Sequence, residues 1–283
     1  MDQEANQAKA TGNGKEPELL TARWINGAMS RTKQVLSENF FNANVHWLSL
    51  CGLYGLYVTA AIGLLISIIL AVRIDSFVVF ITGMGGALLC IVLQYIAAQF
   101  LSISKTAVDS TPSHLSSEAF PQCISLIFLL SGIISFLSLF VLSIQQGNLT
   151  LFFTGVGCLV FFGYYFTASI HPSLLNVEIA EGLTAGEEAI GILSFLLKGF
   201  LRLIPIWFGA GVVLGTLNFA VHSIKIFGDY PAYAMGMLSS SAVVVLVMAS
   251  LPFMGFLVFL FHYLTVDLIR SVIEIPKKLD NRQ

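Results

Sequence analysis

Residues 48–72 read LSLCGLYGLYVTAAIGLLISIILAV, and this stretch decides the class of fold. It holds no Asp, Glu, Lys or Arg, and about 20 apolar residues are enough for a helix to cross the hydrocarbon core of a bilayer. Comparable runs follow along the chain, and we place the spanning segments at 48–72, 77–100, 123–144, 149–170, 203–221 and 235–265. The sequence therefore predicts an all-α polytopic transmembrane bundle of about six spans, arranged as three hairpins and accompanied by amphipathic interfacial helices.

The composition of the whole chain agrees with this prediction. Hydrophobic residues make up 56% of the chain and charged residues 11%, against roughly a quarter charged in soluble domains. A soluble core cannot absorb that excess, whereas lipid allows a helix to be apolar on every face. The net charge of -2 and the lack of a basic patch interleaved with aromatic residues argue against nucleic acid as a partner.

Lys and Arg are concentrated on one side of the predicted spans, and only Arg73 and Lys225 fall on the other side. Basic residues resist translocation, so we expect both termini in the cytoplasm, with the inner membrane of a bacterium as the location. The predicted organisation is a disordered polar tail (1–18), a basic amphipathic cytoplasmic helix (19–45), the transmembrane bundle (46–266) and a cytoplasmic C-terminal tail (267–283).

The stretch before the fifth span has the pattern of a separate surface helix. Thr184-Ala185-Gly186-Glu187 fits a capping box, which predicts a helix start. A polar stripe with a spacing of three or four residues follows, and it consists of Glu187, Gly191, Ser194, Lys198 and Arg202. We interpret 185–202 as an interfacial elbow helix on the cytoplasmic membrane face, with Pro205 bending the chain into the fifth span.

Charged side chains on the cytoplasmic side are the candidate binding residues. The basic ones are expected to meet lipid headgroups or an acidic partner, or else only to anchor the helices at the interface; they are Lys198, Arg202, Arg23, Arg31 and Lys33. An acidic cluster on the same side could pair with the basic helix, bind a divalent cation or only solvate a loop, and it consists of Glu178, Glu181, Glu187 and Glu188.

Small residues on the spans predict close helix packing. They are Gly52, Gly55 and Gly63 on the first span and Gly211 and Gly215 on the fifth. Small side chains let helix backbones approach each other in lipid, within one bundle or in a homo-oligomer. The span centres carry no Asp, Glu, Lys or Arg, which disfavours proton-coupled transport and intramembrane proteolysis.

Three histidines, His46, His171 and His262, are expected near one depth at the cytoplasmic ends of spans. Imidazoles can hold a metal ion or a haem, so they are the minor metal candidates. Interfacial histidines with one wetted end are the favoured alternative, and we expect no cofactor. Since no nucleophile with a nearby base, phosphate loop or zinc motif stands out, we also expect no enzymatic activity.

The leading hypothesis is a non-enzymatic scaffold, assembly or membrane-organising component that acts through its cytoplasmic face. Its expected partners are membrane lipids, other membrane or cytoplasmic proteins, and further copies of itself. The alternative is a permease-type transporter subunit, because a basic N-terminal helix, six spans and a cytoplasmic link after the second span broadly resemble the layout of some ABC permeases. A haem- or metal-binding membrane protein is the minor alternative.

Overall fold

The computed structural model describes residues 20–180, 182–227 and 231–280, in two compact units divided after Ser37. The described part of the first unit contains helix α2 (Leu20–Val35), which ends before the predicted limit of residue 45. Arg23 lies in α2, Arg31 is exposed and Lys33 is half-buried. The predicted tail, residues 1–18, lies outside the described residues.

The second unit contains the membrane-spanning part. Among the described residues, six helices are long and apolar enough to cross a bilayer, which confirms the predicted all-α polytopic bundle. They are α3 (Glu38–Ile74), α4 (Phe77–Ser110), α5 (Ala119–Gln146), α6 (Leu149–Ile170), α7 (Ala185–Lys225) and α8 (Pro231–Asp280).

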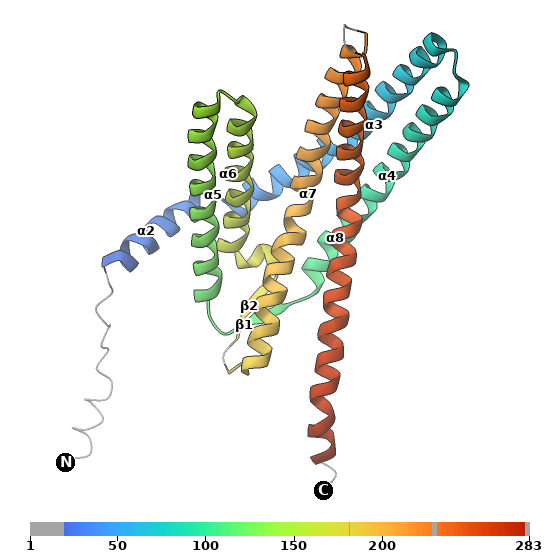
Figure 1. Ribbon diagram of the computed structural model, residues 1–283. Coiled ribbons are helices and arrows are strands. Elements are labelled where there is room, and N and C mark those ends of the chain that lie inside the picture. Colours follow the sequence, from blue (N-terminus) through green and yellow to red (C-terminus); the bar gives the residue numbers. More distant parts are fainter. Residues whose placement is uncertain (1–19, 181, 228–230, 281–283) are drawn as a thin grey trace, which may run out of the picture. The chain divides into compact units, whose positions relative to one another are not determined.

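Successive helices pack as antiparallel hairpins, α3 with α4, α5 with α6 and α7 with α8, as Figure 1 shows. The α5–α6 turn is made by Gly147, whose φ of 61° is in the left-handed region that glycine adopts without steric cost. Its N–H donates to the Ser143 carbonyl, one of the carbonyls that a helix end leaves unpaired. The short turns keep each pair of helices together.

Helices α3, α4, α7 and α8 share a core in which Leu56, Ala97, Phe208 and Val245 are fully buried. The α5–α6 hairpin joins this core through α6, where the Tyr165 hydroxyl donates to the Leu196 carbonyl of α7 at 2.8 Å. The core is therefore a four-helix arrangement with one hairpin added to it.

Several helix boundaries differ from the predicted ones, and three of them change the interpretation. Helix α3 begins at Glu38, well before the apolar run. Helix α7 continues through Pro205, although this proline removes one backbone donor; packed neighbouring helices make such prolines tolerable in membrane proteins. The separate elbow helix expected there is therefore wrong, because one helix runs from Ala185 to Lys225. Helix α8 reaches Asp280, so the expected tail is helical over most of its length.

Candidate functional site

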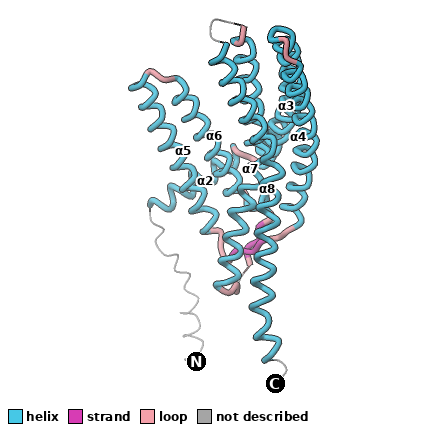
Figure 2. The backbone as a smooth tube through the Cα atoms, turned by 45° about the vertical axis from the view of Figure 1, so that its right-hand side comes forward, coloured by secondary structure: helices cyan, strands magenta, loops and turns pink. Residues whose placement is uncertain are grey.

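The two longer connections of the second unit fold together at one end of its helices. Strand β1 (Ser113–Leu115) pairs in parallel with β2 (Val177–Ile179), and the short helix η1 (Pro172–Leu175) leads into β2. Figure 2 shows the strands, in magenta, beside the first turns of α7. We call this end of the unit the strand end, and residues 111–118 and 171–180 the platform.

The side of the platform that packs against α7 is apolar. Leu115, Leu175 and Phe195 are fully buried in one cluster, so each connection and the first turns of α7 contribute a side chain to it. Burial of large apolar side chains is worth about 1.5–3 kcal/mol each. The platform is thus anchored to α7 through packing as well as through polar contacts.

Lys198 of α7 lies beneath the platform and is fully buried. Its ammonium donates hydrogen bonds to the Thr111 carbonyl and, at 3.2 Å, to the Asn176 carbonyl. These residues follow the last residues of α4 and η1 as their C-caps. Helix C-termini carry unpaired carbonyls and partial negative charge, so the buried cation satisfies both ends at once. We call this arrangement the Lys198 junction.

Asn176 joins the parts of the Lys198 junction. Its φ of 49° places it in the left-handed region, where asparagine is one of the few tolerated side chains. Its side-chain amide donates to the Asp109 carbonyl at 2.8 Å, and its own carbonyl also accepts from the Ser113 N–H at 3.1 Å. One residue therefore ties the second connection to α4 and to β1.

Arg202, one helical turn further along α7, ties α7 to two other helices. Its Nη2 donates to the Asn42 Oδ1 of α3 at 3.0 Å, and its Nη1 lies 3.8 Å from the Asp109 carboxylate of α4. Arg202 is only 9% exposed, and its buried Nε has no hydrogen-bond partner among the described residues.

The first turns of α7 approach β1 very closely. A Cβ at Gly191 would overlap the His114 carbonyl oxygen, so only glycine fits there. The Glu188 carboxylate accepts from the Ser116 N–H at 2.7 Å. The predicted capping box is confirmed, since Thr184 Oγ1 accepts from the Glu187 N–H and the Glu187 carboxylate accepts from the Thr184 N–H.

The predicted surface position of the polar stripe is therefore wrong for four of its five residues, and only Glu187 is exposed. Gly191, Ser194, Lys198 and Arg202 are all buried, and they face neighbouring parts of the protein. Helical spacing identifies the residues that share a face, but it does not say what covers that face. Here backbone carbonyls of the connections and polar side chains on neighbouring helices cover it.

The acidic residues are held separately. Glu178 lies 3.7 Å from the ring of His114, Glu187 belongs to the capping box, and Glu188 binds the Ser116 N–H. Glu181 lies outside the described residues. These contacts do not support the predicted single acidic cluster.

The three histidines are also held apart. His171 lies 3.7 Å from the Glu38 carboxylate, which also accepts from the Ser173 hydroxyl. His262 hydrogen-bonds Ser194 Oγ at 3.1 Å, and His46 lines a separate pocket. Within the described residues no group of three or more His, Cys, Asp or Glu could hold a metal ion. The described contacts therefore do not bring the three histidines together.

The Ser194–His262 pair links α7 to α8 and is a contact that the sequence pattern missed. Ser194 has the right spacing for the polar stripe, but nothing in the sequence pairs it with a residue 68 positions later. Ser194 is 3% exposed. We interpret the pair as a polar tie between two helices of the core.

Four of the glycines named from the sequence lie at contacts between core helices. On α3, Gly52 faces Phe208 and Gly209 of α7, and Gly55 faces Val212. Gly211 and Gly215 of α7 face Met248 and Val245 of α8. Gly63 is looser, with the Phe219 ring 3.6 Å from the position of a Cβ.

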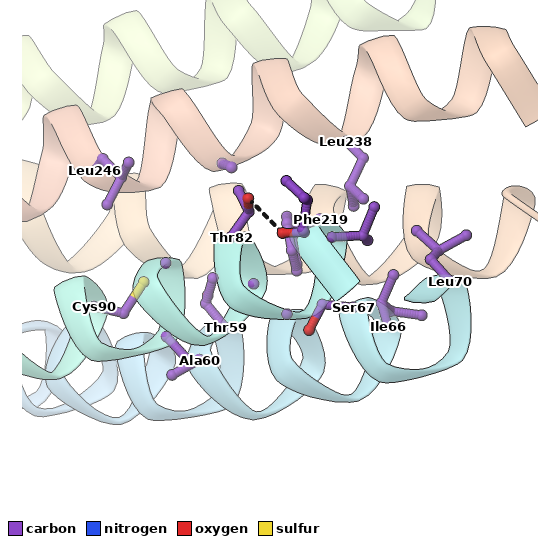
Figure 3. Close-up of a pocket in the computed structure, with 17 residues that line it drawn as sticks. Thr59, Ala60, Ile66, Ser67, Leu70, Thr82, Cys90, Phe219, Leu238 and Leu246 are labelled. Atoms are coloured by element: carbon purple, nitrogen blue, oxygen red, sulfur yellow. Dashed lines mark hydrogen bonds between the residues drawn. The ribbon is translucent and has the colours of Figure 1, made fainter. Parts of the chain in front are cut away.

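A larger pocket lies away from the strand end, between α3, α4, α7 and α8 (Figure 3). Its volume is about 360 Å³. Three of its hydroxyls are engaged, since Thr59, Ser67 and Thr82 donate to backbone carbonyls of their own helices. Most of the remaining lining residues are apolar, so the pocket suits an apolar guest such as an acyl chain.

The outer faces of the helices carry large exposed apolar side chains, which bear on the class of protein. Trp47, Phe153 and Phe261, on three different helices, are 67%, 65% and 68% exposed, and such apolar exteriors need a lipid solvent. Comparison with protein-family models, curated proteins and solved structures found no match to this chain. The six apolar helices make it a multi-pass membrane protein.

Proposed function

We propose that this chain is a non-enzymatic membrane scaffold that holds a partner protein at its strand end. The observation that carries the proposal is the platform itself. Two connections that could have been independent loops are joined by strand pairing and by the Lys198 junction. A preorganised surface loses less conformational entropy when a partner binds.

The exposed side of the platform suggests the chemistry of that partner. Glu118 and Glu178 are exposed there, and Glu187 is exposed in the neighbouring first turn of α7, while Lys198 and Arg202 are buried. A protein with a basic surface is electrostatically complementary to these carboxylates. The proposed partner of the platform is therefore a basic protein, whereas the sequence alone favoured lipid headgroups or an acidic partner for the basic residues on this side.

The proposal also assigns the strand end to the cytoplasm, with both termini on that side. The basis is the distribution of Lys and Arg. In a cysteine-free background, Ser116→Cys lies just before α5 and Gln146→Cys is its last residue, so one thiol marks each end of this helix. An impermeant maleimide added to intact cells should label Gln146→Cys and should label Ser116→Cys only after lysis. The reverse pattern would contradict the assignment.

Cross-linking tests the scaffold. A photo-reactive residue at Ser117 should give a discrete adduct in cells, and Glu118→Lys with Glu178→Lys should reduce its yield at least about fivefold, as expected for lost charge complementarity. Lys225→Glu, at the exposed end of α7 opposite the strand end, is the control and should leave the yield unchanged. An adduct that is absent, or insensitive to the double charge reversal, would exclude a basic partner at this surface.

A permease-type subunit is the second candidate, and the pocket between α3, α4, α7 and α8 favours it. This pocket of about 360 Å³ has an apolar lining and lies among four candidate spans. The same cross-linking experiment separates the two functions. An ATPase cross-linked at Ser117 would favour the transport subunit, whereas a partner without nucleotide hydrolysis would favour the scaffold.

A further inference from the structure

A second pocket, between α3, α4 and α7, lies beside Arg202. Its volume is about 220 Å³, far above the roughly 15 Å³ that one water needs. Helix α3 contributes His46 and Ser49 to its wall, α4 contributes Ser104 and Lys105, and α7 contributes Arg202. We call it the Arg202 pocket.

Two buried polar groups of the Arg202 pocket lack partners. Arg202 is 9% exposed and Ser104 is 4% exposed, and neither the Arg202 Nε nor the Ser104 Oγ has a hydrogen-bond partner among the described residues. An unsatisfied buried polar group costs about 1–3 kcal/mol. Both residues line this one pocket, so an acceptor bound in it would supply a partner to two helices at once.

The charges around the pocket determine the sign of that acceptor. Arg202 and Lys105 are cations that line it. Asp109 is not part of the lining, and its carboxylate lies 3.8 Å from Arg202 Nη1 with its side chain 53% exposed. Asp109 can offset only one of the two positive charges. The pocket is therefore suited to an anion.

The donor set points to a tetrahedral oxyanion. The lining residues Arg202, Ser104 and the exposed Lys105 come from two helices and carry an N–H, a hydroxyl and an ammonium group. Phosphate oxygens can accept from several such donors at once. The pocket lies close to the strand end, since α4 continues for only five residues beyond Lys105, to Ser110. Basic pockets between transmembrane helices at this level are suited to phosphate headgroups.

We propose that the Arg202 pocket binds a phosphate group through Arg202, Ser104 and Lys105. The phosphate comes either from a phospholipid headgroup or from the aqueous phase, and both sources present the same acceptor chemistry. Binding fills the unsatisfied valences of two core helices, so it stabilises the packing of α4 against α7.

The test uses the full-length chain and two phosphate sources. Inorganic phosphate is titrated into protein in a neutral detergent at constant ionic strength, and phosphatidic acid is titrated into phosphatidylcholine nanodiscs that contain the protein. We expect the Tm to rise by several degrees at saturation. A rise in the Tm in both titrations identifies free phosphate as an accepted ligand. A rise in the Tm with phosphatidic acid alone identifies the lipid headgroup as the ligand.

The variants avoid the ties that hold Arg202. Ser104→Ala with Lys105→Gln removes two donors to the phosphate and should weaken the apparent affinity about tenfold or more. Arg202 keeps its contacts to Asn42 and Asp109, so the packing of the helices should be preserved. Lys225→Gln removes an equal charge from the other end of α7 and should bind like the wild type. The proposal is overturned if neither source raises the Tm, or if the double variant binds as tightly as the wild type.

Discussion

Lys198→Ala is expected to lower the free energy of unfolding by about 3 kcal/mol, the largest effect of any single side chain in the Lys198 junction. The substitution leaves the Thr111 carbonyl without the donor that it has now, and it opens a cavity under the platform. A lost hydrogen bond from a charged donor costs about 1.5–3 kcal/mol, and deletion of buried side-chain atoms adds to it. In detergent the Tm should fall by roughly 6–12 °C.

Two further variants separate charge from volume. Lys198→Met keeps most of the buried volume but supplies no donor, so it should still lose more than half of the stability lost in Lys198→Ala. Lys225→Ala removes an exposed lysine from the same helix and should change stability by less than about 0.5 kcal/mol. Hydrogen exchange should accelerate in residues 111–116 and 171–180 of Lys198→Met. Wild-type exchange and stability in Lys198→Met would refute the structural role of the ammonium.

The hairpin fold was predictable because its determinants are local in sequence. Apolar runs of spanning length and the short turns between them fix which helices pair, and Gly147 marks one of those turns. The capping box at Thr184 was also readable, since both partners lie within four residues. The helix ends were not predictable, because α3 begins at Glu38 in a polar segment whose helix continues into the span.

The site was not predictable to the same extent, because its contacts join residues far apart in the chain. Lys198 and Arg202 stood out as cations on one helix face, but their partners are Thr111, Asn176 and Asn42. Two of these partners act through backbone carbonyls, which carry no signature in the sequence. The polar stripe therefore gave the correct residues and the wrong environment.

On the α3 side the predicted Gly52 and Gly55 do lie against α7, but the α7 side of this close approach escaped the glycine pattern. The sequence favours the Gly211–Gly215 pair, yet the nearest backbone contact is at Gly209. A Cβ there would overlap the carbonyl oxygen and carbon of Leu48 in α3. The Cβ positions at Gly211 and Gly215 are nearest to side-chain atoms of α8, which can move more easily than a backbone carbonyl. Gly209 is therefore the glycine on α7 that sets the distance between these two helices.

Gly209→Ala is accordingly expected to destabilise the protein by about 2 kcal/mol, because α3 and α7 must separate to admit one methyl group. Gly86→Ala is the matched control, since no atom lies within 4 Å of its Cβ position. That change should be neutral or should stabilise α4 by up to about 1 kcal/mol through higher helix propensity. Gly211→Ala should fall between them, because Met248 can change rotamer. Unfolding of the purified variants in one detergent measures the order of their stabilities. A Gly209→Ala variant as stable as Gly86→Ala would show that α3 and α7 are not in backbone contact.

Since Arg202 also reaches from α7 to Asn42 of α3, separation of the helices should weaken phosphate binding in the Arg202 pocket as well.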